Sequence, residues 1–208
     1  FYYFMILCTK VMTKEFFFFV CALVYLIPLY LISRRLFKKY WFYSFLMFCI
    51  SFSFWAYGTN GIRNGLATSL FILAISFYKN KYVLLGLMLF SCTFHQTMFL
   101  PTIAYVITLF YNNTNKYILA WLIAIPVSLI LGNFLVTYIE MSGIGVDKVG
   151  LYFTEEIDEG FSKTGFRWDF LIYSSLAVFS GWYFIYKKKF QDKFYNHLYN
   201  TFLIANTV

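Results

Sequence analysis

Charged residues are scarce in this sequence. Only 12% of its 208 residues are Asp, Glu, Lys or Arg, and just 9 residues are acidic. A soluble domain carries about 25% charged residues, so this chain has too little charge to coat a surface that faces water. With 61% hydrophobic residues and a mean hydropathy of +0.67, the composition excludes a soluble globular domain and predicts a membrane protein.

The motifs of soluble enzymes and of metalloproteins are missing as well. There is no P-loop, no HExxH sequence, no dinucleotide-binding glycine motif and no nucleophile elbow in a supporting context. The cysteines stand singly inside apolar runs and form no CxxC pair: Cys8, Cys21, Cys49 and Cys92. We therefore expect no metal site, no redox site and no cofactor.

The basic residues occur in short clusters beside apolar runs. The clusters lie at Arg34–Lys39, Lys79–Lys81 and Lys187–Lys189, within a chain of net charge +8. Such clusters are typical of cytoplasmic loops under the positive-inside rule. A basic stripe able to follow a nucleic-acid backbone is lacking, so we expect no nucleic-acid binding.

Apolar runs of the length needed to cross a membrane, about 20 residues, alternate with these clusters. The clear segments are Phe16–Ile32, Tyr40–Tyr57, Ile62–Tyr78, Ile118–Ile139 and Trp168–Tyr186. One crossing over Tyr82–Phe110 would put the last basic cluster on the wrong side of the membrane. We therefore predict two short passes, Tyr82–Phe94 and Gln96–Phe110, with a break around His95 and Pro101.

The fold class that follows is an all-α polytopic transmembrane helix bundle. We expect one transmembrane domain over residues 1–208, with roughly seven to eight membrane-inserted segments. Because the chain starts at Phe1 and stops at Val208 while an apolar segment is still running, we expect a fragment with both ends missing.

This topology places the polar residues on the outer side of the membrane. The loop over about 140–167 is the only sizeable hydrophilic segment, and with the residue just beyond it holds seven of the nine acids: Glu140, Asp147, Glu155, Glu156, Asp158, Glu159 and Asp169. Acidic residues barely affect orientation, so an acidic outer loop is compatible with the basic clusters inside. Arg63 and His95 lie on the same outer side.

Two arginines stand at the N-terminal ends of predicted helices. Arg63 is in the first turn of Ile62–Tyr78, and Arg167 precedes Trp168–Tyr186. A helix N-terminus carries partial positive charge and unpaired N–H groups, so an arginine there is unfavourable unless an anion lies between them. Two guanidinium groups on one membrane face suit a diphosphate, because arginine binds phosphate oxygens in bidentate fashion.

Residues next to the two arginines are candidates to support diphosphate binding, but the arginines and glycines also have a simpler interpretation. Asn64 follows Arg63, and Asp169 lies where it could partly satisfy Arg167. An arginine near a helix end can also simply extend to the lipid headgroups. Gly61 and Gly65 could simply allow two helices to pack closely, without a role in binding.

His95 is the candidate catalytic residue. An ionisable residue inside a membrane segment predicts a functional site, and a histidine is suited to take a proton from an attacking hydroxyl. Asp169 or the loop glutamates could act as the base instead, and a lone histidine could simply cap a helix.

Three stretches carry a resemblance in their order and spacing. They are GIRNGLATSLFILA at Gly61–Ala74, KNKYVLLGLMLFSCTFHQTMFLP at Lys79–Pro101 and GFRWDFLIYSSLAVFSGWYFIYKKKFQDKFYN at Gly165–Asn196. With this set, the chain from about Phe16 to Val208 resembles the EpsG family of bacterial membrane proteins, which includes O-antigen and capsule polymerases of the Wzy type. The family more often has glutamine where Asn64 stands, and its arginine-bearing segment beyond Asn206 and acidic-proline motif before Phe1 are absent here.

The resemblance implies a glycosyltransferase, an oligosaccharide repeat-unit polymerase, in the bacterial inner (cytoplasmic) membrane. It would join undecaprenyl-diphosphate-linked oligosaccharides into O-antigen, capsule or exopolysaccharide at the outer face, with no metal and no nucleotide sugar. Arg63 and Arg167 would then bind diphosphate, and His95 would be the base or orient the acceptor. A chain-length regulator and a flippase of the same pathway are the implied partners.

Other functions remain open at this stage. A transporter or flippase of the same lipid-linked sugars should show internal repeats and midplane charges, and the sequence shows neither. A non-catalytic membrane subunit of a polysaccharide assembly complex would use its outer loop to bind a partner. An acyltransferase that used His95 would need an acyl donor, for which the sequence gives no sign.

Overall fold

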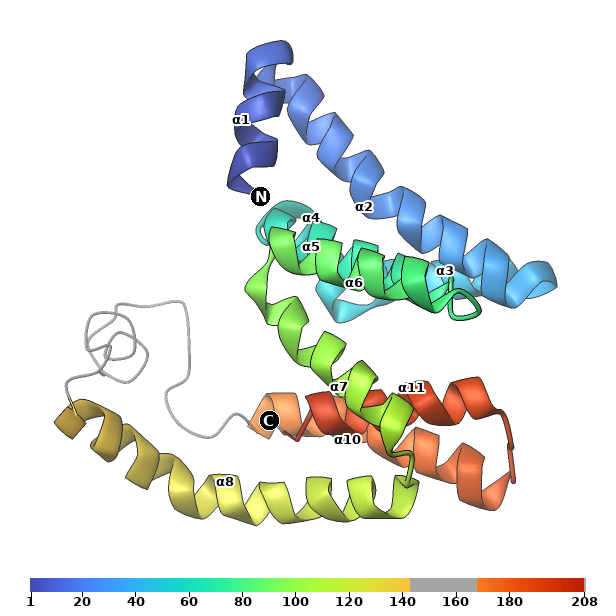
Figure 1. The fold of residues 1–208 in the computed structure, drawn as a ribbon, viewed down its shortest axis with the longest axis vertical. Coiled ribbons are helices and arrows are strands. Elements are labelled where there is room, and N and C mark those ends of the chain that lie inside the picture. The colour runs from blue at the N-terminus through green and yellow to red at the C-terminus, as the bar shows by residue number, and fades with distance from the viewer. Residues whose placement is uncertain (143–167, 208) are drawn as a thin grey trace. The chain divides into compact units, whose positions relative to one another are not determined.

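The structure is a computed structural model that describes residues 1–142 and 168–207. Within these ranges every regular element is a helix (Figure 1), which confirms the all-α prediction for this part of the chain. The chain forms two compact units, Phe1–Ile103 and Ala104–Val208. We describe each unit by itself; one transmembrane domain over the whole chain stays a prediction.

The first unit contains α1 (Tyr2–Val11), α2 (Lys14–Phe37), a 3-10 turn (Lys38–Tyr40), α3 (Trp41–Ile50), α4 (Phe52–Thr59), α5 (Ile62–Ile75), α6 (Lys81–Phe94), the 3-10 turn η2 (Gln96–Met98) and the start of α7 (Phe99–Phe110). Side-chain oxygens cap two of its helices. Thr13 accepts a hydrogen bond from the Phe16 N–H at the start of α2, and Asn80 accepts one from the Val83 N–H at the start of α6.

The segment predicted as one span at Tyr40–Tyr57 is two helices, α3 and α4. They are separated by Ser51, whose backbone is extended and whose hydroxyl donates to the Phe48 carbonyl. The chain reverses just before them, where Lys38 at φ 42° ends α2 within the basic cluster. The helix is interrupted here because serine bonds its own backbone and so competes with the helical ladder. A membrane span over Tyr40–Tyr57 stays a prediction.

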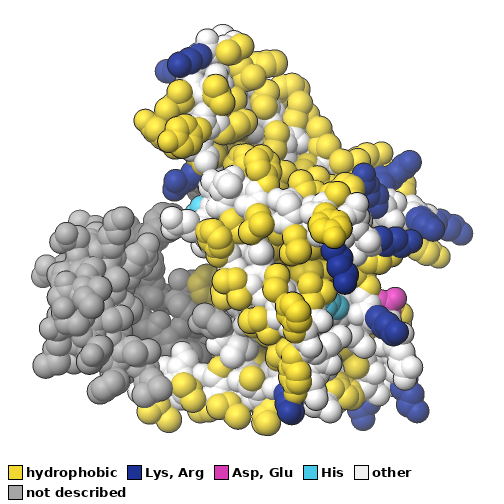
Figure 2. All heavy atoms as spheres, viewed as in Figure 1, with side chains coloured by type: hydrophobic (Ala, Val, Ile, Leu, Met, Phe, Trp, Pro, Cys, Tyr) yellow, Lys and Arg dark blue, Asp and Glu magenta, His cyan; other side chains and the backbone are white. Residues whose placement is uncertain are grey.

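Among the described residues, one helical stretch is long and apolar enough to cross a membrane: Lys14–Ile50, which consists of α2, the 3-10 turn and α3 and includes the reversal at Lys38. Shorter apolar helices occur at Ile62–Ile75, Lys81–Phe94, Gln96–Phe110 and Thr114–Ile130. Figure 2 shows hydrophobic side chains spread over the visible face of the first unit, with Lys and Arg gathered where α2 turns into α3. Several of the largest exposed hydrophobic side chains lie on α2: Phe16, Phe18, Phe19, Leu23 and Ile27. Exposed apolar surface of this extent is typical of contact with lipid or protein, and the polytopic bundle stays a prediction.

Helix α5 is the centre of the first unit. It contributes more buried residues than its neighbours, among them Leu66, Ala67 and Ser69. The Ser69 hydroxyl donates to the Tyr25 carbonyl of α2, and Arg35 Nη1 of α2 lies 3.2 Å from Ser76 Oγ just beyond α5. These two contacts show that α2 and α5 run in the same direction. The basic end of α2 therefore meets the end of α5 that leads to Lys79 and Lys81.

Gly65 allows α4 and α5 to approach closely. A Cβ added at Gly65 would lie 2.6 Å from the Tyr57 carbonyl oxygen and 3.1 Å from Tyr57 Cβ. A Cβ at Gly61 would meet the Tyr57 ring at 3.3 Å. The packing interpretation of Gly65 is thus confirmed, since any side chain there has to displace backbone.

We expect Gly65→Ala to destabilise the protein by about 1–3 kcal/mol, the usual effect of overpacking a tight contact. The measurement is the thermal unfolding midpoint of the purified protein in detergent. Gly86→Ala is the matched control, because α6 leaves open space within 4 Å of that Cβ. It should raise stability by up to about 1 kcal/mol through helix propensity. Equal midpoints for the two variants would contradict the packing role of Gly65.

The break predicted around His95 and Pro101 occurs at His95 alone. His95 is extended at φ −149° and ψ 131°, between the end of α6 and the turn η2. Pro101 lies inside the first turn of α7 and does not break it, because the N–H that proline lacks has no helical partner there.

The second unit contains the rest of α7, α8 (Thr114–Ser142), α10 (Trp168–Trp182), the π-helical turn η3 (Tyr183–Lys187) and α11 (Lys193–Ala205). Its described core joins α8, α10 and α11 through Trp121, Val178, Tyr199 and Leu203. The Tyr199 hydroxyl donates to the Val178 carbonyl at 2.8 Å. The predicted segment Trp168–Tyr186 is thus an α-helix that changes to π-helical geometry for its last residues.

Candidate functional site

The polar turn between α4 and α5 leaves the start of α5 without a side-chain cap. The N–H groups of Asn60 and Gly61 both donate to the Ala56 carbonyl, which closes α4. Gly61 is the N-cap of α5 and has no side chain that could accept from the first-turn N–H groups. These donors and the helix dipole make the start of α5 a place that favours an anion.

Arg63 adds a full positive charge to this helix start. Its side chain is exposed, and its guanidinium carbon lies 5.9 Å from the centre of the Phe1 ring. With the described residues Arg63 forms no hydrogen bond and no ion pair. Glu15 is the sole acidic residue in the sequence of the first unit. A guanidinium at a positive helix end, without a described counter-ion, favours binding of an anion.

Asn64, the next residue, joins this helix start to His95. The Thr97 hydroxyl in η2 lies 2.8 Å from His95 Nδ1 and donates to Asn64 Oδ1 at 3.3 Å. The Thr97 backbone N–H also points to His95 Nδ1, at 3.3 Å. The structure thus brings together two of the predicted residues, Asn64 and His95, through a threonine between them. Because Arg63 precedes Asn64, all of these groups lie at one end of the first unit.

The hydrogen bonds of His95 fit two tautomers. When the proton is on Nδ1, that atom donates to Thr97 Oγ1, which donates to Asn64 Oδ1, and Nε2 presents a free lone pair. When the proton is on Nε2, Nδ1 instead accepts from the Thr97 N–H. Nε2 makes no hydrogen bond with any residue of the described ranges. The first arrangement suits a general base, because Nδ1 still donates to Thr97 after Nε2 has taken a proton.

The sequence predicts no role for Thr97. Its only sequence signal is its position two residues after His95, because in a turn a side chain can accept a hydrogen bond from the backbone N–H two residues further on. Its contact to Asn64 spans 33 residues and depends on how η2 packs on α5.

The structure describes neither the Arg167 nor the Asp169 side chain. Arg167 and most of the acidic loop at 140–167 lie outside the described residues. Asp169 is in the first turn of α10, and its side chain is not described. Across the described ranges, no group of three His, Cys, Asp or Glu side chains is arranged to hold a metal ion.

A second polar cluster, also not anticipated from the sequence, lies in the second unit. Thr108 on α7 is almost fully buried, and its hydroxyl oxygen lies 3.0 Å from Thr201 Oγ1 and 3.4 Å from His197 Nε2 on α11. The rings of His197 and Tyr105 pack in a T-shaped arrangement with ring centres 4.3 Å apart. His197 and Thr201 are four residues apart, the spacing that puts both on one face of a helix.

This second cluster connects two helices. Thr201 donates its hydroxyl proton to the His197 carbonyl, which leaves its oxygen free to accept from Thr108. The Thr108 hydroxyl also lies 2.8 Å from the Tyr105 carbonyl of its own helix. Beside them, Asn200 Nδ2 donates to Asn112 Oδ1. Buried polar pairs of this kind hold helices together where no water competes. We therefore assign the cluster to the packing of α7 on α11.

Comparison with known proteins gives one match. The model of the EpsG family matches residues 1–208, the whole chain. No curated protein and no solved structure is detectably similar to the chain.

Proposed function

The chain belongs to the EpsG family of polymerase-like membrane proteins linked to exopolysaccharide synthesis, and from this premise we propose that it polymerises lipid-linked oligosaccharides. Each repeat unit would be carried on undecaprenyl diphosphate. The product would be an O-antigen, capsule or exopolysaccharide, made at the outer face of the bacterial inner membrane. The protein would cross that membrane several times, with its basic turns in the cytoplasm.

The observation that carries this proposal is the cationic, uncapped start of α5. Arg63 stands there without a described acidic partner, next to the Asn64–Thr97–His95 chain of hydrogen bonds. A diphosphate could accept from the first-turn N–H groups of α5 and from the guanidinium at once. His95 Nε2 would lie at the same end of the unit to act on the sugar.

The reaction would transfer a glycan from one lipid carrier to another repeat unit. A sugar hydroxyl of the acceptor attacks the anomeric carbon of the donor glycan, and the new glycosidic bond forms as the bond to the diphosphate oxygen breaks. The hydroxyl proton passes to His95 Nε2, and the diphosphate leaves on its lipid with the bonding electrons. Arg63 would stabilise the charge that develops on the diphosphate, so the step would need no metal. It would need no nucleotide sugar, because the donor glycan already carries a diphosphate leaving group.

Two further residues complete this proposal. Arg167, outside the described ranges, would be the second ligand of the diphosphate, with Asp169 of α10 as a supporting residue. A chain-length regulator and a flippase of the same pathway would be the protein partners.

The test is the length profile of the surface polysaccharide on a gel, for a strain that lacks the full-length gene. We expect deletion to replace the long ladder with single-repeat material, and the wild-type gene to restore the ladder. Loss of even the single-repeat material would contradict the proposal and favour a transporter. If only loop residues such as Glu155 and Glu156 proved necessary, and neither Arg63 nor His95, a non-catalytic subunit would be favoured.

A further inference from the structure

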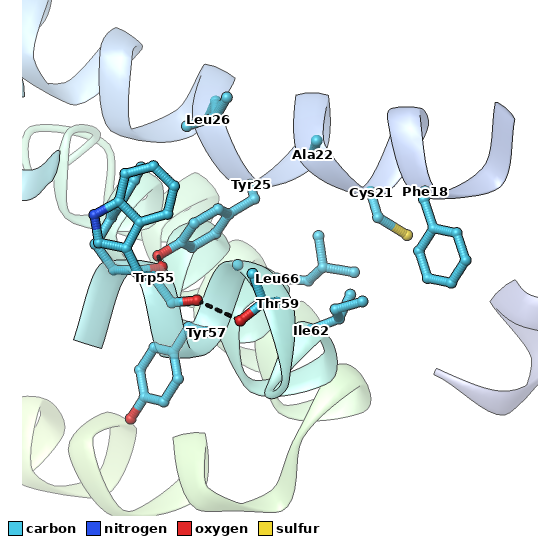
Figure 3. Close-up of a pocket in the computed structure, with 12 residues that line it drawn as sticks. Phe18, Cys21, Ala22, Tyr25, Leu26, Trp55, Tyr57, Thr59, Ile62 and Leu66 are labelled. Carbon is cyan, nitrogen blue, oxygen red and sulfur yellow. Dashed lines mark hydrogen bonds between the residues drawn. The ribbon is translucent and has the colours of Figure 1, made fainter. Parts of the chain in front are cut away.

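An apolar cavity of about 230 Å³ lies between α2 on one side and α4 and α5 on the other. Figure 3 shows its lining, with Phe18, Cys21 and Tyr25 from α2 facing Ile62 and Leu66 from α5. All of these residues belong to the first unit. The cavity is open at the surface of the unit, where Phe18 and Trp55 are exposed, and its apolar lining favours an apolar occupant.

Two of the three hydroxyl groups in this lining already form hydrogen bonds. The Tyr25 hydroxyl donates to the Phe54 carbonyl at 3.0 Å, and the Thr59 hydroxyl donates to the Trp55 carbonyl at 2.8 Å, a bond drawn in Figure 3. Figure 3 also shows the Tyr57 hydroxyl pointing away from the other labelled side chains. The lining therefore suits a hydrocarbon, since a polar occupant would lose its hydrogen bonds to water and gain few in return.

The cavity reaches the start of α5, where the anion site lies. Thr59, the last residue of α4, and Ile62, the first residue of α5, both line it. Arg63 and Asn64 follow Ile62 directly. A molecule with an anionic head at Arg63 would thus have an apolar cavity beside that head.

We propose that this cavity holds the hydrocarbon chain of the lipid diphosphate whose head group binds at Arg63. The inference rests on the proposed function and adds a chain-binding site to it. The occupant is the chain of the substrate itself and not that of a bulk phospholipid. The reason is charge complementarity, because a diphosphate offers the uncapped helix start and the guanidinium more negative charge than a phosphodiester does.

Photolabelling of the purified full chain in lipid nanodiscs tests this proposal. The probe is a prenyl diphosphate with a diazirine in its hydrocarbon chain, and the comparison probe is phosphatidylglycerol with a diazirine in an acyl chain. The labelled residues are identified by mass spectrometry. We expect the prenyl diphosphate to label residues within Phe18–Leu26 or Phe54–Leu66, and the phospholipid to label them far less.

Two variants fill the cavity from opposite walls. Ala22→Phe acts from α2, where Ala22 is exposed and lines the cavity. Gly58→Leu acts from α4, where an added Cβ would lie in ordinary contact with the Tyr25 ring at 3.5 Å. Each should reduce labelling about tenfold, the loss expected when roughly two buried CH₂ groups are displaced. Ala120→Phe, the same change at an exposed alanine of α8, is the control and should leave labelling unchanged.

Equal labelling of these residues by the phospholipid would overturn the proposal in favour of bulk lipid. Undiminished labelling in both filling variants would overturn it as well. The proposed function is tested separately, by the length profile of the surface polysaccharide on a gel. A ladder that depends on Arg63 without cavity labelling would refute the chain site alone, whereas cavity labelling with an upstream block on the gel would refute the polymerase.

Discussion

Replacing Arg63 with alanine is expected to collapse the long polysaccharide ladder to single-repeat material. The guanidinium would be lost from the uncapped start of α5, where it has no described counter-ion and faces the diphosphate leaving group in the proposed reaction. Removing one preorganised group that stabilises developing charge lowers the rate by about 10²- to 10³-fold, or roughly 2.7–4 kcal/mol. Arg63→Lys should retain a shortened ladder, because lysine keeps the charge but loses the bidentate geometry.

Arg34→Ala is the matched control for this experiment. Arg34 is also exposed, but it lies at the basic end of α2, with its guanidinium carbon 5.4 Å from the Trp41 ring centre. We expect a normal ladder from this variant and equal protein levels of both variants on an immunoblot. An unchanged ladder in Arg63→Ala would refute the diphosphate role, and a collapsed ladder in both variants would point to lost membrane insertion.

Replacing His95 with glutamine is expected to have the second large effect. Loss of a general base lowers the rate by about 10²- to 10⁴-fold, so the strain should make very short glycans. The measurement is the rate of chain extension in membranes supplied with the lipid-linked repeat unit.

Variants of Thr97 test whether His95 acts in catalysis or has only a structural role. In Thr97→Val the hydroxyl that connects His95 Nδ1 to Asn64 Oδ1 is gone, while His95 itself remains. We expect a rate about tenfold lower, since one hydrogen bond that orients the ring is lost, and we expect Thr97→Ser to restore it. If His95→Gln and Thr97→Val both keep the wild-type rate, His95 only caps the turn η2.

Much of the fold was predictable because the relevant signals are local. Long apolar runs with basic residues between them predicted helices and turns, and the turn at Lys38 and the break at His95 occur where expected. Two local details of the helices differ from what the apolar runs suggested. Ser51 divides a run that looked continuous, and Pro101 sits where a helix tolerates it. Composition and periodicity do not distinguish a helix interior from its first turn.

By itself, the sequence determined the helical class, the resemblance to the EpsG family and the place of Arg63 at a helix start. These features follow from the hydrophobicity of the side chains and from patterns among residues close in the chain, both of which can be read from the sequence. Only the tertiary structure decided that Thr97 joins Asn64 to His95, that Gly65 permits close packing of α4 and α5, and that an apolar cavity adjoins the start of α5. Each of these depends on which faces of separate helices meet, and that is set by the fit of side chains distant in sequence.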